Sequence, residues 1–527
     1  MRMLLLWIHS HIATLTIFTP LLVAALVVLC PSLWVAKWLA LLGAGACFLE
    51  SVHMWHYFVP GSGLQFTEMH AWLPQWGIQY FVGVDGISLL LIMLSTFLTC
   101  LLLIGAWNFE GKGQKTFFAL LLFLESGMLG ALMAFDLVFF YVCWEVMLIP
   151  MYFIIGVWGG KNRIYATTKF ILYTAFGSLL MLVAAISLYL LYKKEFGVYS
   201  TNVLDLYRLS GLPAASQFWL FCAFALAFAI KIPLWPFHTW LPHAHTEAPT
   251  TGSVILAGVM LKMGTYGLLR FAIPLFPAVF LDFAPVLSVL GVIGIIYGAL
   301  VAWQQPDAKK MVAYSSVSHL GFVVVGSCAV LHSMISPEAL TGAVYQMINH
   351  GVSTGMLFFL VGVLYDRRHT RLLDDFGGLA RPMPWFAVLL IIATLGSVGL
   401  PGTGGFVGEF LILLGTFQSN PAIAILASLG VLLGAVYMLT LCRKILFGPV
   451  THKENESLQD VSWREALVLA PLAVLVIAMG VQPGFFLDRV RPSIDHLAKT
   501  YSEYRLERVE LPPLGCCKGG CSNGCEE

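Results

Sequence analysis

The sequence predicts an all-α polytopic membrane protein with about fourteen transmembrane helices. Of its 527 residues, 59% are hydrophobic and only 11% are charged, whereas soluble domains carry about 25% charged residues. Apolar runs long enough to cross a bilayer recur along the whole chain. The first run passes directly into others without a signal-peptide cleavage pattern. The net charge of +1 argues against nucleic acid as a partner.

The apolar runs define the expected spans. They fall near residues 12–30, 32–49, 81–106, 116–135, 137–158, 166–192, 213–246, 250–273, 283–303, 311–332, 338–365, 384–416, 420–447 and 462–482. Pro233 and Pro236 interrupt the seventh run, because proline lacks the N–H that a helix interior needs. Pro401 lies in a glycine-rich interruption of the twelfth run. Two broken spans, five helices apart, predict a repeated transporter fold with its site near the breaks.

Lysine and arginine residues concentrate in alternate loops. One set of loops contains Lys112, Lys115, Lys161, Arg163, Lys309, Lys310, Arg367, Arg368, Arg371, Arg381, Arg443, Lys444, Lys453 and Arg464. The opposite set, apart from the C-terminal tail, contains only Arg2, Lys193, Lys194, Arg208 and Arg270. The positive-inside rule therefore predicts that the first set faces the cytoplasm and that both termini lie outside.

Ionisable residues inside the spans are the main functional signal, because each costs at least about 2.5–3.5 kcal/mol to insert. The candidates are Glu145, Lys231, Lys262, His319, His350 and Glu409. Acids, lysines and histidines on successive spans are what a proton relay requires. A static ion pair between Glu145 and Lys231 is a simpler alternative. His319 and His350 could likewise be satisfied interhelical hydrogen-bonding groups.

Further polar residues flank this set. His238 and His243, with His245, follow the first break and are interpreted as the polar cytoplasmic end of the relay. Glu125 is a candidate second carboxylate. The tail cysteines Cys516, Cys517, Cys521 and Cys525 are compatible with disulfides, a metal site or a tail without structure. The spans contain no ligand pattern for haem or Fe–S clusters and no dinucleotide loop, so we expect no redox site in this chain.

Several motifs together resemble one family. They are Trp144-Glu145, Lys231-Ile232-Pro233, Leu241-Pro242-His243-Ala244-His245, Tyr314-Ser315-Ser316-Val317-Ser318-His319 and Gly399-Leu400-Pro401. This set is similar to the proton-translocating, antiporter-like subunits of NADH–quinone oxidoreductase, respiratory complex I. The stretches 84–88 and 406–410 look most like the subunit M, or chain 4, branch of that family.

The resemblance implies a fold and a division of roles. The fold would be a fourteen-helix core with two inverted five-helix repeats, each with a broken helix. Glu145 would partner Lys231, Lys262 and His350 would bridge two half-channels, and Glu409 would end the path to the outside. The implied segments are N-terminal helices with an external loop in 1–110, the first repeat in 111–273 and the second in 274–447. The last helix with an interfacial segment (448–510) and the Cys-rich tail (511–527) follow.

The resemblance also implies partners. The chain would be one subunit of a proton-pumping NADH:quinone oxidoreductase in a bacterial inner membrane, next to other antiporter-like subunits and the lipid bilayer. NADH, FMN, Fe–S clusters and quinone would be bound by partner subunits. A subunit of an Mrp-type sodium/proton antiporter, of a membrane-bound hydrogenase or of a ferredoxin-linked complex shares the same core and is the alternative.

Overall fold

The computed structural model describes residues 2–61, 63–209, 212–331, 334–450 and 452–509. The first half contains α1 (Arg2–Ser10), α2 (Ile12–Leu29), α3 (Leu33–Tyr57), α4 (Gly86–Gly105), α5 (Gln114–Met133), α6 (Leu137–Val146), α7 (Leu148–Trp158), α8 (Arg163–Phe196), α9 (Val203–Leu206), α10 (Ala214–Lys231), α11 (Trp240–Glu247), α12 (Thr250–Ile255), α13 (Leu261–Gly267) and α14 (Ile273–Leu275). The second half contains α15 (Pro277–Trp303), α16 (Ala308–Ser327), α17 (Pro337–Arg368), α18 (Pro384–Val398), α19 (Gly404–Ser419), α20 (Pro421–Leu446), α21 (Trp463–Val481) and α22 (Gly484–Val509). The four tail cysteines, Cys516, Cys517, Cys521 and Cys525, lie outside the described residues.

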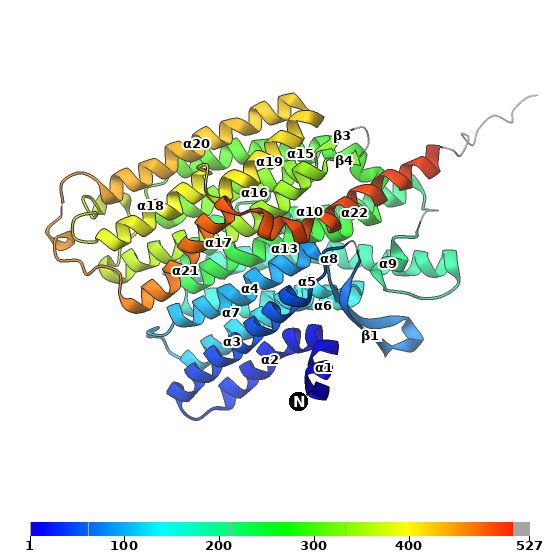
Figure 1. Cartoon of the computed structure of the whole chain (residues 1–527), viewed down its shortest axis with the longest axis horizontal. Coiled ribbons are helices and arrows are strands. Elements are labelled where there is room, and N and C mark those ends of the chain that lie inside the picture. The colour runs from blue at the N-terminus through cyan, green and yellow to red at the C-terminus, as the bar shows by residue number, and fades with distance from the viewer. Residues whose placement is uncertain (1, 62, 210–211, 332–333, 451, 510–527) are drawn as a thin grey trace, which may run out of the picture.

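The predicted all-α membrane fold is confirmed. Within the described residues, twelve helices are long and apolar enough to cross a membrane. α16 and the pair α18 and α19 lie among these helices and occupy the positions of the two remaining predicted spans, and the long helices run roughly side by side as one elongated bundle (Figure 1). The outer helices expose large apolar side chains, including Leu172 at 64% and Leu432 at 66%, as lipid-facing or subunit-facing surfaces do.

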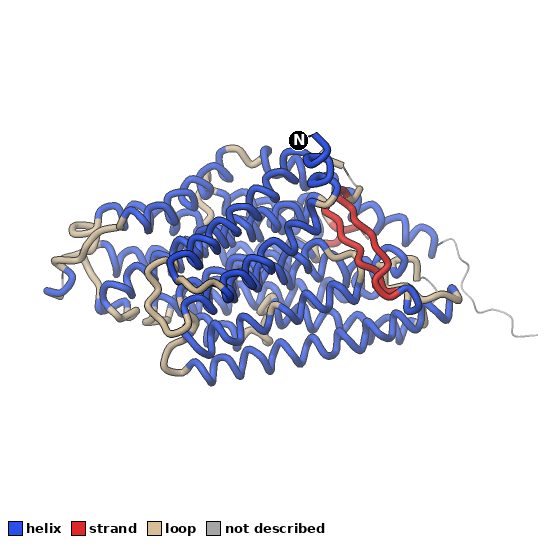
Figure 2. Tube along the Cα trace, turned by 90° about the horizontal axis from the view of Figure 1, so that it is seen from below, coloured by secondary structure: helices blue, strands red, loops and turns tan. Residues whose placement is uncertain are grey.

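The segment after α3 differs from the external loop predicted within residues 1–110. α3 continues to Tyr57, so Glu50 lies within a helix. Strands β1 (Gln65–Leu73) and β2 (Ile78–Val84) then form an antiparallel hairpin along one end of the bundle (Figure 2). Pro74 and Gly77 occupy the turn between them, and Gly77 has a φ of 64°. The hairpin contacts α2 through Glu68, which accepts hydrogen bonds from the N–H and the hydroxyl of Thr14.

Both predicted helix breaks are present. α10 ends at Lys231, and α11 begins nine residues later at Trp240. Pro233 leaves the carbonyl of Ala229 without its usual partner, but the N–H of Leu234 donates to that oxygen at 2.9 Å. The indole N–H of Trp240 donates to the carbonyl of Ile230, also at 2.9 Å. The break therefore leaves these buried carbonyls hydrogen-bonded, as a membrane interior demands.

The second break separates α18 from α19. Gly399 ends α18 with a φ of 76°, a left-handed conformation that glycine adopts without the steric cost of a Cβ. Pro401 follows in the turn, and α19 begins at Gly404.

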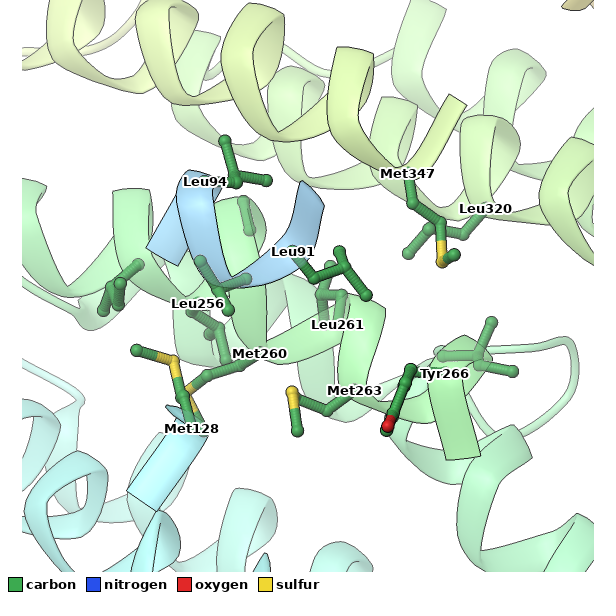
Figure 3. Packing of buried hydrophobic residues seen from close by; sticks show 14 of the residues in the cluster. Leu91, Leu94, Met128, Leu256, Met260, Leu261, Met263, Tyr266, Leu320 and Met347 are labelled. Carbon is green, nitrogen blue, oxygen red and sulfur yellow. The ribbon is translucent and has the colours of Figure 1, made fainter. Parts of the chain in front are cut away.

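Two spans are wholly enclosed by the other helices, and both contain candidate site residues. All of the apolar part of Thr250–Leu275 and of Pro337–Arg368 is buried. Figure 3 shows the packing around the first of them, in which Met260, Leu261 and Met263 lie between side chains of neighbouring helices. Those neighbours include Leu91, Leu94, Met128, Leu320 and Met347. Lys262 and His350 thus lie at the centre of the bundle, away from its outer surface.

Candidate functional site

Lys262 lies in a span whose backbone is not regular α-helix. Its short helix, α13, is flanked by two π-helical segments, η2 (Leu256–Met260) and η3 (Leu268–Ala272). Such π-turns are uncommon and are frequent at functional sites. The Lys262 ammonium donates to the carbonyl of Ala257 within η2, and its Nζ lies 2.6 Å from Nδ1 of His350 on α17.

His350 begins a series of contacts across three helices. Its ring centroid lies 5.6 Å from that of His319 on α16. His319 in turn places Nδ1 3.0 Å from Oε1 of Glu409 on α19. We call Lys262, His350, His319 and Glu409 the central polar chain. All four residues are buried, with at most 5% of any residue exposed.

Neutral polar groups hold the far end of the central polar chain in place. The side-chain amide of Gln346 donates to Glu409 Oε1 at 3.0 Å. The second ring nitrogen of His319 lies 3.2 Å from the hydroxyl of Ser397 and 3.4 Å from that of Tyr437. Within the described residues Glu409 has these hydrogen-bonding partners but no ion pair with a lysine or arginine. The hydrogen bonds offset part of the free-energy cost of burying its carboxyl group.

Lys231 and Glu145 lie near each other without forming the expected ion pair. They are close enough to interact electrostatically, but within the described residues no ion pair of 4.0 Å or less joins them. The Lys231 ammonium has no hydrogen-bond partner there and lies 5.1 Å from the ring centroid of Trp144. One carboxylate oxygen of Glu145 is also buried without a partner.

The three histidines after the first break do not converge on one point. His243 is exposed, and its ring contacts Tyr165 at a centroid distance of 5.2 Å. His238 is buried with its ring 5.0 Å from that of Tyr297. His245 is fully buried, and its ring stacks on Phe358 at 4.7 Å. This separation does not suit a shared metal ion.

His245 lies between Lys262 and a polar cavity. It interacts electrostatically with Lys262 and with Lys309, and in the described part of the chain neither of its ring nitrogens has a hydrogen-bond partner. Lys309 lines a cavity of about 620 Å³ together with Glu247 and Asp366. The cavity lies at the end of the bundle where the arginine- and lysine-rich loops gather, and Arg371 and Arg464 also line it.

Glu125 is separate from the other candidates. On α5, a Cβ at Gly127 would meet Met147 at 3.0 Å and Val146 at 3.3 Å, so this side of α5 faces the Glu145 region. Glu125 precedes Gly127 by two residues, which corresponds to about 200° around a helix. Its carboxyl group therefore points away from Glu145 and toward α2, α3 and α4.

The sequence did not identify several residues that contribute to the site. Ser397 and Tyr437 had no signal of their own, because a hydroxyl in an apolar helix is common. Gln346 precedes His350 by one helical turn, and that polar spacing was a usable signal. Closeness in sequence to His238 and His243 does not reveal the position of His245, which in α11 is fully buried toward the bundle interior.

Comparisons with known proteins agree on one family. A family model for the transmembrane region of NADH:quinone oxidoreductase and Mrp antiporters matches residues 134–434. NADH-quinone oxidoreductase subunit M of Rhodobacter capsulatus is 44% identical over 476 residues, covering 88% of this chain and 91% of the relative. A chain of respiratory complex I from Thermus thermophilus is 34% identical with a TM-score of 0.84, covering 93% of this chain and 99% of that chain. A chain of the Mrp complex from a Dietzia species matches with a TM-score of 0.80, covering 94% and 99%, but at 20% identity this likeness concerns the fold alone.

Proposed function

The chain belongs to the antiporter-like membrane subunit family of NADH:quinone oxidoreductase and Mrp complexes, and we propose that it moves protons as the subunit M of a complex I. In this proposal protons pass along the buried Glu, Lys and His side chains while partner subunits oxidise NADH and reduce quinone. FMN, Fe–S clusters and quinone belong to those partners, and this chain contributes no redox group.

The observation that carries the proposal is the central polar chain. Its contacts of 2.6 Å between Lys262 and His350 and 3.0 Å between His319 and Glu409 are hydrogen-bond distances across which a proton can move. In the described part of the chain no hydrogen bond joins the imidazole rings of His319 and His350, whose centroids are 5.6 Å apart, so a small rearrangement can make or break this connection. A pump needs such an interruptible step, because a permanently continuous path would let protons leak.

The polar cavity supplies the protons in this proposal. Lys309 and Glu247 at the cavity can exchange protons with water, and His245 lies between Lys309 and Lys262. If the arginine- and lysine-rich loops face the cytoplasm, as the positive-inside rule predicts, uptake occurs from the cytoplasm and both termini lie outside. Glu409 then delivers protons toward the outside.

Glu145 and Lys231 serve as the controlling pair in this proposal. When their side chains are apart, Lys231 is held by Trp144 and has no carboxylate contact. When the carboxylate approaches, the charged form of Lys231 is favoured. That electrostatic change reaches the neighbouring span, because α10 packs directly against α13, which carries Lys262.

The redox pump is favoured over an Mrp-type antiporter by the relatives. Subunit M of Rhodobacter capsulatus is 44% identical and the matched chain of Thermus thermophilus complex I is 34% identical, whereas the Mrp chain is 20% identical. Purification of the complex with its partner subunits separates the two possibilities directly.

The test uses Lys262→Met in inside-out membrane vesicles. NADH-driven acidification of the vesicle interior is measured alongside the rate of quinone reduction, with Lys194→Met as a control at an exposed position. We expect the Lys262 variant to lose at least about tenfold in pumping, as general acid–base groups contribute about 10²–10⁴-fold, while the complex assembles. Normal pumping with normal assembly would exclude the central polar chain as the proton path.

A further inference from the structure

A second buried carboxyl group lies outside the central polar chain. Glu125 on α5 is 0% exposed, and in the described part of the chain neither of its carboxyl oxygens has a hydrogen-bond partner of good geometry. It lies among α2, α3, α4 and α5, which are neighbours at one side of the bundle (Figure 1). The proposed proton path through Lys262 gives this group no role.

Another carboxyl group lies near Glu125. Glu50 on α3 is close enough to interact with it electrostatically. One oxygen of Glu50 accepts a hydrogen bond of 3.0 Å from the Thr19 hydroxyl on α2. The other oxygen is buried and, within the described residues, has no partner. The two carboxyl groups therefore each carry an oxygen without a donor in the same enclosed region.

In the part of the chain that the structure describes, the groups around the two carboxyls are hydroxyls and thiols, with no positive charge among them. The groups that face the two carboxyls are Thr16 and Thr19 of α2, Cys47 of α3, and Thr99 and Cys100 of α4. Among the residues that the structure describes, neither carboxyl forms an ion pair. A carboxylate buried without a cation costs several kcal/mol, and two such groups side by side cannot both ionise easily.

We propose that Glu50 and Glu125 form a second proton-binding site, in which Glu125 holds the proton and Glu50 exchanges it. Glu125 is the better holder because it is fully enclosed and, in the described part of the chain, neither of its carboxyl oxygens accepts a hydrogen bond of good geometry. Glu50 is only half-buried, and the Thr19 hydroxyl stabilises its charged form. The site takes a single proton and needs no metal.

The site is distinct from the proposed relay in position. Gly127 lies on the opposite side of α5, against Val146 and Met147, which follow Glu145 in the chain. A proton on Glu125 is therefore separated from Glu145 by the width of α5. The inference stands whether or not the central polar chain conducts protons, because it concerns only the protonation of Glu125.

Infrared difference spectroscopy on the whole purified complex tests the site. A protonated buried carboxyl gives a C=O stretching band that shifts in D₂O. We expect this band at pH 7 to 8 in the unmodified complex and its loss in Glu125→Gln. Glu195→Gln, at an exposed carboxyl at the end of α8, is the matched control and should keep the band.

Three results would overturn the assignment. An unmodified complex whose spectrum matches that of Glu125→Gln would mean that Glu125 is ionised. Loss of the band when sodium chloride replaces choline chloride would mean that the site holds a cation in place of a proton. If the complex with Glu125→Gln does not assemble, Glu50→Gln tests the site in its place. Removing the neighbouring charge must shift the C=O band of Glu125, and an unchanged band would show that the two groups do not share a site.

Discussion

The turn at Gly399 allows a test of whether the position of Glu409 limits proton transfer. Gly399 has a φ of 76°, and a Cβ placed on it would lie 3.2 Å from Oε2 of Glu409. Gly402 in the same turn has a φ of 94°, and nothing lies within 4 Å of its Cβ position. Gly399→Ala and Gly402→Ala therefore share backbone strain of about 1–2 kcal/mol, and only the first pushes on Glu409.

The expected magnitude follows from that contact. Relief of a 3.2 Å approach requires a displacement of the carboxyl group of about 0.3 Å, and a 1 Å misplacement of a reacting group can cost about 10²-fold. If the logarithm of the rate falls in proportion to the displacement, a displacement of about 0.3 Å lowers the rate of proton transfer about fourfold. We expect Gly399→Ala to pump about fourfold fewer protons per quinone reduced, and Gly402→Ala to pump normally, with similar thermal stability for both.

The assay is NADH-driven acidification of inside-out vesicles, normalised to the rate of quinone reduction. A melting curve of each purified variant confirms that the two substitutions destabilise the complex by similar amounts. Equal pumping by the two alanine variants would refute the reasoning, because the position of Glu409 would then have no influence on transfer.

Further substitutions test the Lys231 region and the ion pair of Asp85. Trp144→Leu removes the ring near the Lys231 ammonium, an interaction worth about 0.5–2 kcal/mol, so we expect proton pumping to fall by about two- to thirtyfold. Lys231→Ala or Glu145→Ala should abolish pumping. Unchanged pumping in Trp144→Leu would show that the ring does not hold the lysine. Asp85 caps α4 and forms a buried ion pair with Arg270, and breaking such a pair costs about 3–5 kcal/mol. Asp85→Asn should therefore lower the melting temperature of the complex, and an unchanged melting curve would contradict the stabilising role.

The sequence was most informative where structure is determined locally. Proline removes a specific backbone donor, and glycine permits a left-handed turn, so Pro233 and Gly399 mark the two breaks without knowledge of the tertiary fold. The identities of the buried ionisable residues followed in the same way, because an apolar span makes each charged side chain conspicuous. The turn residues Pro74 and Gly77 also signalled the β-hairpin, which the prediction of an external loop within residues 1–110 did not include.

Contacts between spans could not be derived from spacing. The pairing of His319 with Glu409 depends on how α16 and α19 pack, and the absence of a direct ion pair between Lys231 and Glu145 depends on rotamers. The π-turns beside Lys262 have no residue signature, since Leu256–Met260 contains only ordinary helix-compatible residues and one glycine. Glu125 was visible in the sequence, but only the rotation of α5 separates it from Glu145.

Lys231 and Lys262 share a physical feature that bears on proton movement. A carboxylate in contact with a buried lysine would hold it charged, because separating such a pair in a low dielectric is costly. Lys262 instead contacts a backbone carbonyl and an imidazole. Lys231 lies at the C-terminal end of α10, and its ammonium is 5.1 Å from the ring centroid of Trp144 on α6. The partial negative charge of a helix C-terminus contributes about 0.3–2 kcal/mol and that of a ring about 0.5–2 kcal/mol. These interactions orient each ammonium but leave its proton transferable. The irregular backbone beside each lysine contributes one of its weak partners, the Ala257 carbonyl for Lys262 and the C-terminal end of α10 for Lys231, where a carboxylate would trap the charge.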